Sequence, residues 1–305
     1  MTGTRGVVGE GSPDAAPRAT ATATATTVVT VVYRNRTLDL GWVPDDAAVV
    51  IVHNDRALDP ASVAHPRAAH VVLDANVGYG AGMNAGLREV TTPRVIVANP
   101  DLTLGPAHWA ALTNATPEEI VTVPLDDADG EPTATVTPYP TPLTHLVTGY
   151  RLGRFVRRGT PLRSLLNRTT SWTRTHEETG RLPSGRWPLR DRYVGGALFS
   201  IDTERLRAVG GFDERYFLYF EEIDLCARLA ARFPDMDAVL AATPPGIHAV
   251  GASSRGAESP TVRHHARSSA RYAHGHAGLA WRATEGALVL RGRWLDRPQR
   301  AGRAG

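Results

Sequence analysis

Short runs of consecutive apolar residues, rich in Val and Ile, recur along the first half of the chain. The runs are residues 28–33, 47–53, 70–74, 94–98 and 120–124. Continuous apolar runs of this length are typical of strands that are buried on both faces, as in parallel sheets. A helical stretch over residues 80–90 lies between the third and the fourth run. This alternation of strand and helix predicts an α/β fold with an open, mostly parallel, twisted sheet and flanking helices.

The pattern changes in the second half of the chain. Residues 125–190 are rich in Pro, Thr and Arg, and short helices are expected over 143–156 and 161–170. The later expected elements are a strand over 193–201, a helix from Thr203, strands over 236–242 and 247–250, and a helix over 274–291. The sequence shows no internal repeat.

Composition divides the chain into three parts. Residues 1–26 are mostly Gly, Ala, Thr and Pro with few large apolar side chains, so we expect a disordered tail. Residues 27–255 form the expected main domain, with one half over 27–124 and a second over 125–255. Residues 256–305 are Arg- and His-rich and are expected to form a helical extension and a tail. The 305 residues, 42% of them hydrophobic, can bury a substantial core.

Charge and cysteine content narrow the function classes. The net charge is +3, and every Lys or Arg position holds Arg, which favours a compositional bias over nucleic-acid binding. No motif combines aromatic and basic residues as nucleic-acid-binding proteins do. Cys226 is the only cysteine, which excludes an internal disulfide and fits a reducing compartment. Because no apolar run reaches the roughly 18 to 20 residues of a membrane span, we expect a cytoplasmic protein, soluble or bound peripherally at the membrane.

Polar and glycine-rich loops follow the first four expected strands. In chain order they contain Tyr33 and Asn35; His53, Asn54 and Asp55; Asn76, Gly78 and Asn84; and Asn99 and Asp101. Each loop alone is compatible with an ordinary turn. Ligands of open parallel sheets bind beyond the carboxyl ends of the strands, so four such loops at one edge predict a binding site.

The segment 210–228 carries the most specific chemistry. A double glycine and several aromatic residues lead into a helix that begins with Glu221 and Glu222. Crowded, partly desolvated carboxylates repel each other, so one of them could act as a general base. The alternative is a solvated acidic helix start that is stabilised by the helix dipole.

Taken in order, these segments resemble the family 2 glycosyltransferases, and within them the bacterial rhamnosyltransferase-like branch. The resemblance covers residues 27–254. It rests on Asn76-Val77-Gly78 with Asn84 and Gly86, Asn99-Pro100-Asp101, Gly195-Gly196-Ala197, the segment 210–228, and His248 with Gly251 and Ser253. It implies a GT-A fold with a Rossmann-like nucleotide-binding half, a nucleotide-diphosphate sugar as donor, and Mg²⁺ or Mn²⁺. It also implies inversion at the anomeric carbon.

The resemblance also implies roles for individual residues. Asp101 and His248 would hold the cation, and Glu222, with Glu221 beside it, would be the catalytic base. The donor-binding residues would be Tyr33, Asn35, His53, Asn54 and Asp55 around the nucleobase, Asn76, Gly78, Asn84 and Asn99 along the nucleotide and sugar, and the backbone of Gly195, Gly196 and Ala197.

The chain departs from the family pattern at several of these positions. His53 stands where the family usually has Asp, Arg34 is inserted between Tyr33 and Asn35, and Glu222 stands where Asp is common. Asp101 is the only acid in its motif. An alternative function is therefore a catalytically weakened module of the same fold that binds nucleotide sugars.

The acceptor side is described only coarsely by the sequence. The resemblance implies transfer of rhamnose or another hexose to a saccharide or lipid-linked glycan in cell-envelope or polysaccharide biosynthesis. The basic and apolar stretch over 143–170 is either an interfacial segment or an Arg-rich solvated face. We interpret His264, His265, His274 and His276 as surface residues rather than metal ligands, because no acidic partner lies near them in sequence.

Overall fold

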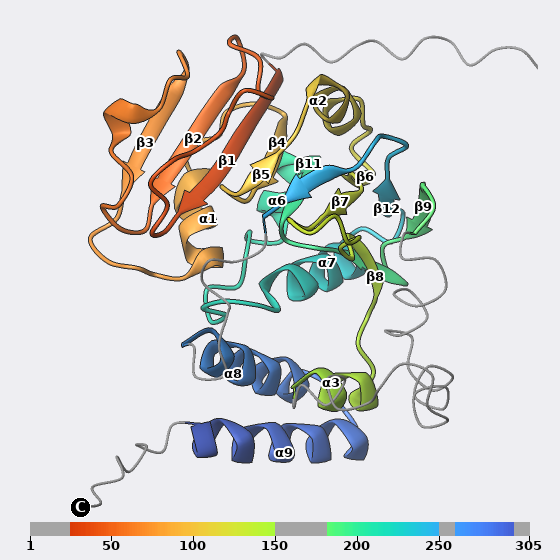
Figure 1. Cartoon of the computed structure of the whole chain (residues 1–305). Coiled ribbons are helices and arrows are strands. Elements are labelled where there is room, and N and C mark those ends of the chain that lie inside the picture. The colour runs from red at the N-terminus through yellow and green to blue at the C-terminus, as the bar shows by residue number, and fades with distance from the viewer. Residues whose placement is uncertain (1–24, 150–181, 250–259, 296–305) are drawn as a thin grey trace, which may run out of the picture.

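The computed structural model describes residues 25–149, 182–249 and 260–295, and its main element is an eight-stranded sheet (Figure 1). The strand order is β3-β2-β1-β4-β11-β6-β12-β9. The strands are β1 (Thr26–Val32), β2 (Ala48–His53), β3 (Ala68–Val72), β4 (Arg94–Ala98), β6 (Glu119–Thr122), β9 (Gly185–Pro188), β11 (Leu198–Asp202) and β12 (Asp237–Leu240). The first four are mutually parallel, and β11 runs antiparallel to both of its neighbours. The expected α/β class with an open, mostly parallel sheet is confirmed.

The apolar runs form strands because both faces of the sheet are covered. Every residue of β1 is buried. Val29 and Val31 pack into the cluster on one face, while Val28 and Val32 pack into the cluster on the other. Helices α1 (Tyr79–Leu87) and α7 (Glu221–Arg232) contribute to the first cluster, and α2 (Pro106–Thr113) contributes to the second.

Smaller strands form two further sheets. One small sheet pairs β8 (Val136–Pro138) with β10 (Arg192–Val194). Another places β13 (Gly246–His248) between β5 (Leu102–Thr103) and β7 (Leu125–Asp126). A 3₁₀ turn, η2 (Pro60–Ser62), follows β2, and α6 (Thr203–Ala208) follows β11.

The C-terminal helices form a separate layer with α3. The helices α3 (Pro142–Gly149), α8 (Pro260–His274) and α9 (Leu279–Leu295) pack together below α7 (Figure 1). Within the described ranges, none of the helices combines the length and apolar character that a membrane span requires.

Several elements differ from the sequence-based expectation. The strand expected over 193–201 is two strands in different sheets, because the chain turns between them at Gly195, Gly196 and Ala197. The helix expected over 274–291 is replaced by α8 and α9, which are separated at Gly275 and Gly278, where Gly278 has φ 114°. Helix α3 covers the first half of the helix expected over 143–156. The second half of that helix, the helix expected over 161–170, and the tail expected over 1–26 except its last two residues lie outside the described residues. Strand β1 begins at Thr26, two residues before the strand expected from Val28 and one residue before the expected start of the main domain.

Candidate active site

Glu221 and Glu222 begin helix α7 and sit in different surroundings. Glu221 is only 4% exposed, and none of the described residues hydrogen-bonds its Oε2. Burial raises the pKa of Glu221 well above its usual range, and the neighbouring charge of Glu222 raises it further. Half-buried Glu222 also has a pKa raised by burial, which backbone hydrogen bonds from Phe220, Glu222 and Ile223 oppose. The pair therefore has the raised proton affinity that a general base needs.

The backbone that leads into α7 is strained. Tyr219 and Phe220 have φ values of 69° and 73°, in the left-handed region that costs a non-glycine residue about 1 to 3 kcal/mol. Ring contacts with the C-terminal helices hold this conformation. The Phe220 ring lies 5.4 Å from that of His265 and 5.5 Å from that of Tyr272. Ring packing against α8 thus fixes the start of the acidic helix.

Gly196 brings the backbone close to Glu222. A Cβ atom added to Gly196 would lie 3.3 Å from the Cβ of Glu222. The hydroxyl of Tyr79 donates a hydrogen bond of 2.9 Å to the Gly196 carbonyl. Burial raises the pKa of Tyr79 well above its usual range, and the charges of Glu221, Glu222 and Asp101 add to this effect. The Tyr79 phenol therefore stays protonated and able to donate to the Gly196 carbonyl.

Asp101 and His248 meet on the other side of this turn. Their Oδ1 and Nε2 atoms are 3.2 Å apart, and the Asn99 amide nitrogen is 3.2 Å from the same His248 nitrogen. The Asn99 backbone N–H donates to the Ala197 carbonyl at 2.8 Å. The Asp101–His248 pair is therefore connected to Glu221 and Glu222 through Asn99, Ala197 and Gly196. The structure brings the expected metal and catalytic residues into one region.

The donor set around Asp101 fits a divalent cation only in part. A carboxylate oxygen and an imidazole nitrogen converge, and no described residue hydrogen-bonds the buried Asn99 Oδ1. Hard cations take six or more oxygen ligands in most proteins. In the part of the chain that the structure describes, no group of three or more His, Cys, Asp or Glu side chains could hold a metal. Oxygens from a bound ligand would have to complete the coordination.

Three asparagines expected to contact the donor form hydrogen bonds within the protein. Asn54 donates to the Gly78 carbonyl at 2.9 Å, and the Asn76 side chain accepts from the Gly78 N–H at 2.9 Å. The Asn84 side chain bonds the backbone N–H and carbonyl of Phe212. Since these side-chain groups are engaged, we infer that Asn54, Asn76 and Asn84 shape the loops. Their contact with a donor stays a prediction.

Gly78 is required where two loops touch. Its φ is 95°, and a Cβ atom there would lie 2.4 Å from the Phe217 carbonyl oxygen. That oxygen accepts a hydrogen bond of 2.9 Å from the Tyr79 N–H. The glycine-rich loop and the loop that precedes the acid pair are therefore packed backbone to backbone.

The loops after β1 and β2 are joined by Asp55. Its carboxylate accepts from the Arg34 N–H at 2.7 Å and from the Ala57 N–H at 3.1 Å. Asn35 Oδ1 accepts from the N–H of Tyr33, whose side chain is 39% exposed. The first loop is thus ordered, and the Arg34 guanidinium lies over the Tyr33 ring at 5.0 Å from its centroid.

His53 is engaged by a neighbouring strand. It is buried, and its Nε2 lies 2.9 Å from Nδ1 of His70 on β3. Burial and the proximity of His70 lower the pKa of His53, while Asp55 opposes the shift. His70 was not recognised in the sequence, because nothing in a strand pattern shows which residues pair across a sheet.

Two of the four C-terminal histidines stack on aromatic rings. The ring of His264 stacks on that of Phe217 with centroids 4.2 Å apart, and His276 stacks on Trp281 at 4.5 Å. Both are half-buried, as is His265, so their interpretation as surface residues is corrected. His274 is exposed and lies 2.8 Å from Glu285, an acid distant in sequence.

Comparison with known proteins places the chain beside glycosyltransferases. It is 28% identical over 179 residues to the N-acetylglucosaminyl-diphospho-decaprenol L-rhamnosyltransferases of Mycobacterium tuberculosis strains CDC 1551 / Oshkosh and ATCC 25618 / H37Rv, covering 54% of this chain and 54% of each relative. The chain is similar to rhamnosyltransferases. This confirms the resemblance that its motifs indicate, although the match spans only about half the length of these relatives. No family model matches the chain.

Solved structures similar to the chain cover most of its length. The mannosyltransferase PcManGT from Pyrobaculum calidifontis, in complex with GDP-Man and Mn²⁺, is 15% identical with a TM-score of 0.46, covering 89% of this chain and 71% of the other. TarS 1-349 of S. aureus, in complex with UDP, is 11% identical with a TM-score of 0.47, covering 89% of this chain and 72% of the other.

Proposed function

We propose that this protein is an inverting glycosyltransferase that moves a sugar from a nucleotide diphosphate to a hydroxyl group. The main support is the turn at Gly196 and Ala197, because it lies between the acid pair and the Asp101–His248 pair. Glu222 packs on Gly196, and the Asn99 backbone bonds the adjacent Ala197 next to the Asp101–His248 pair. A base and an anion-stabilising group on opposite sides of one sugar carbon are what direct displacement requires.

In this proposal Glu222 is the base. Its ionised carboxylate takes the proton of the acceptor hydroxyl while that oxygen forms a bond to the anomeric carbon. The bond from that carbon to the diphosphate oxygen breaks, and its electron pair leaves with the diphosphate, so the configuration is inverted. We assign the pair's proton to Glu221, which is the less exposed of the two, so that Glu222 is the ionised partner.

Asp101 and His248 would hold Mg²⁺ or Mn²⁺, with the Asn99 amide oxygen as a further ligand. When bound, the cation would neutralise charge on the departing diphosphate. Tyr33, Asn35 and the loop at residues 53–55 would face the nucleobase. The backbone of Gly195, Gly196 and Ala197 would lie against the sugar, with the Tyr79 phenol fixing the Gly196 carbonyl.

The substrates are proposed from the curated relatives. Those proteins are named rhamnosyltransferases acting on N-acetylglucosaminyl-diphospho-decaprenol. We therefore propose a hexose donor such as nucleotide-activated rhamnose, and a lipid-linked saccharide acceptor used in cell-envelope or polysaccharide synthesis. Such an acceptor would place the protein at the inner face of the plasma membrane, as a peripheral protein.

A donor-turnover assay tests the proposal. Release of nucleoside diphosphate from a panel of nucleotide sugars would be measured with Mn²⁺ and a lipid-linked N-acetylglucosamine acceptor. We expect Glu222→Gln to lower kcat by about 10² or more, because general-base catalysis contributes that much. Asp101→Asn should raise the Mn²⁺ concentration needed for half-maximal rate.

The matched control is Glu204→Gln, which removes a carboxylate that is 82% exposed, on helix α6. It should turn over at the wild-type rate. Equal rates for Glu222→Gln and Glu204→Gln would remove Glu222 as the base.

A nucleotide-sugar-binding module without turnover is the second candidate. It is favoured by the incomplete cation site, in which Asp101 is the one carboxylate among the described residues that lies beside His248. Calorimetry would distinguish the two functions. Tight Mn²⁺-dependent binding of a nucleotide sugar, with no product from any acceptor in the panel, would support the module and contradict the enzyme.

A further inference from the structure

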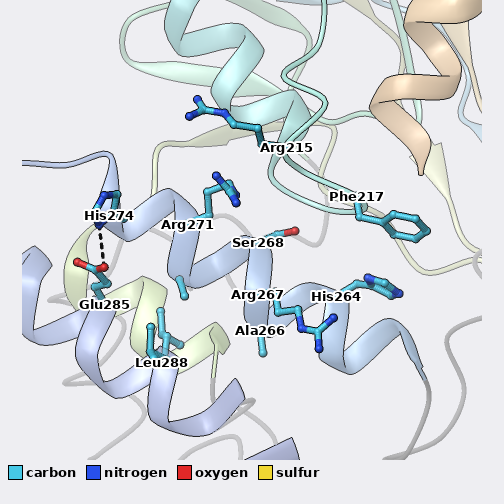
Figure 2. A pocket seen from close by; sticks show the side chains of 12 residues that line it. Arg215, Phe217, His264, Ala266, Arg267, Ser268, Arg271, His274, Glu285 and Leu288 are labelled. Carbon is cyan, nitrogen blue, oxygen red and sulfur yellow. Dashed lines mark hydrogen bonds and ion pairs between the residues drawn. The ribbon is translucent and has the colours of Figure 1, made fainter. Parts of the chain in front are cut away.

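A large cavity lies outside the candidate active site, between the loop before α7 and the helices α8 and α9 (Figure 2). Its volume is about 730 Å³. Arg215 and Phe217 line it from the loop, while Arg267 and Arg271 line it from α8. Cavities of this size accommodate ligands well beyond a single ion.

The lining is strongly basic. It holds three arginines, of which Arg215 is ion-paired with Asp213 at 2.6 Å, and one acid, Glu285, whose carboxylate lies 2.8 Å from His274. Arg271 is exposed and forms no side-chain hydrogen bond or ion pair with a described residue. Burial lowers the pKa of His264 at the cavity wall, and the nearby positive charges of Arg267 and Arg263 lower it further. Arginine donors in such a field favour phosphate groups.

The same cavity also has an apolar wall. Leu288 is fully buried at its base, and Val289 beside it is 36% exposed. Phe217 and Ala270, both half-buried, add apolar surface to the same lining. An anionic group near the arginines and a hydrocarbon chain along α9 would therefore both find complementary surface. A free phosphate would leave the apolar wall unused.

The cavity shares a loop with the candidate active site. The Phe217 carbonyl bonds the Tyr79 N–H on the active-site side, while the Phe217 ring stacks on His264 on the cavity side. The Ser268 hydroxyl donates to the Leu218 carbonyl at 2.8 Å and fastens the same loop to α8. A ligand in the cavity would lie against the segment that leads directly into Glu221 and Glu222.

We propose that this cavity binds an amphiphilic diphosphate, namely the diphosphate and first isoprenoid units of a lipid-linked acceptor. The assignment to an acceptor rests on the proposed function. The donor diphosphate is assigned elsewhere, at Asp101 and His248, so the molecule would have separate sites for two diphosphates. Loop 215–220 would place the acceptor sugar next to Glu222.

Binding of farnesyl diphosphate to the full chain tests this proposal. Calorimetry would compare wild type, Arg271→Gln, the double variant Arg267→Gln/Arg271→Gln, and the control Arg282→Gln, an exposed arginine on α9 outside the cavity. We expect the double variant to bind at least about tenfold more weakly, since lost charge-assisted hydrogen bonds exceed the 1.4 kcal/mol that a factor of ten represents. Arg282→Gln should bind like wild type.

Two further ligands, inorganic pyrophosphate and phosphatidylglycerol vesicles, show which part of farnesyl diphosphate the cavity recognises. Inorganic pyrophosphate should bind wild type more weakly than farnesyl diphosphate does, and equal affinities would contradict a role for the apolar wall. Unchanged farnesyl diphosphate binding in the double variant would overturn the proposal. If the double variant lost only its binding to phosphatidylglycerol vesicles, the arginines would belong to a membrane-binding surface. That result would also overturn the proposal.

The two proposals can fail separately. Mn²⁺-dependent binding of nucleoside diphosphate should be the same in the double variant and in wild type. A protein that binds farnesyl diphosphate through Arg267 and Arg271 but never binds a nucleoside diphosphate would contradict the proposed function while supporting the cavity.

Discussion

Glu221 and Glu222 are neighbours in sequence, yet burial separates their chemistry. Glu221 is enclosed against Gly80, where an added Cβ atom would lie 3.6 Å from the Cβ of Glu221. Glu222 is half-buried and packs on Gly196. Two adjacent acids with unequal desolvation ionise at different pH values, and this difference allows one to hold a proton while the other removes one.

Glu221→Gln should change the pH dependence of stability. A carboxyl group with a raised folded-state pKa binds more protons when folded, so its stabilising effect is complete below the unfolded pKa near 4.5 and is lost as the pH rises towards the folded pKa. Over that window wild type should lose about 1.4 kcal/mol per pH unit relative to Glu221→Gln. Urea unfolding at a series of pH values measures this. Parallel profiles for the two proteins would contradict the unfavourable burial of Glu221.

The sequence could name candidate residues that the structure brings together, but it could not give their contacts. Motif order indicated Asp101, His248 and Glu222, and the structure places all three around one turn. Tyr79 was overlooked as part of a glycine-rich loop, and its bond to Gly196 spans 117 positions of sequence. Such pairings depend on tertiary packing, which local patterns do not encode.

At the scale of elements, the acidic helix depends on the helices that cover it. Helix α7 begins directly after two left-handed residues, which need support from outside the helix. Buried His145 of α3 lies 5.0 Å from the Phe220 ring, and its Nε2 lies 2.7 Å from the Ser269 carbonyl of α8. Burial lowers the pKa of His145 to about 4, so it stays neutral at physiological pH. The layer of α3, α8 and α9 is thus joined to the start of α7.

Tyr272→Ala tests this dependence. Tyr272 is 4% exposed and packs between Phe220 and Trp281, so its removal should cost about 3 kcal/mol of unfolding free energy. It should also lower turnover, because the support of Phe220 is lost. Leu279→Ala, at a side chain that is 84% exposed, is the control and should change stability by no more than about 0.5 kcal/mol. An equally stable, equally active Tyr272→Ala protein would show that α8 does not position α7.

Long apolar strands were predictable, whereas short and polar elements were not. The Val- and Ile-rich runs became β1, β2 and β4 because they are buried on both faces. Helix α8 is rich in Arg, His and Ser, and it buries its face through Tyr272 and small residues that carry a weak apolar pattern. The two-residue strands β5 and β7 were not predicted, because they arise from pairing with the distant strand β13, which overlaps the strand expected over 247–250.

The whole molecule arranges the two proposed substrates on different layers. The loops at the edge of the large sheet and the Asp101–His248 pair form the proposed donor side, while α8 and α9 lie beyond α7, on the proposed acceptor side (Figure 1). Helix α7 stands between them and carries the acid pair. The α/β class followed from the alternation of strands and helices. The docking of the C-terminal layer could not be predicted, because its contacts are aromatic and histidine rings spread over distant segments.

Anomalous X-ray scattering from Mn²⁺ would test the central claim most directly, in crystals grown with a nucleoside diphosphate. The account predicts one strong manganese peak within about 2.5 Å of the Asp101 carboxylate and the His248 Nε2, bridged to the diphosphate. The end of the diphosphate that would carry the sugar should point towards Glu222. A manganese peak and diphosphate bound away from Asp101, with Glu222 facing a different surface, would contradict the account.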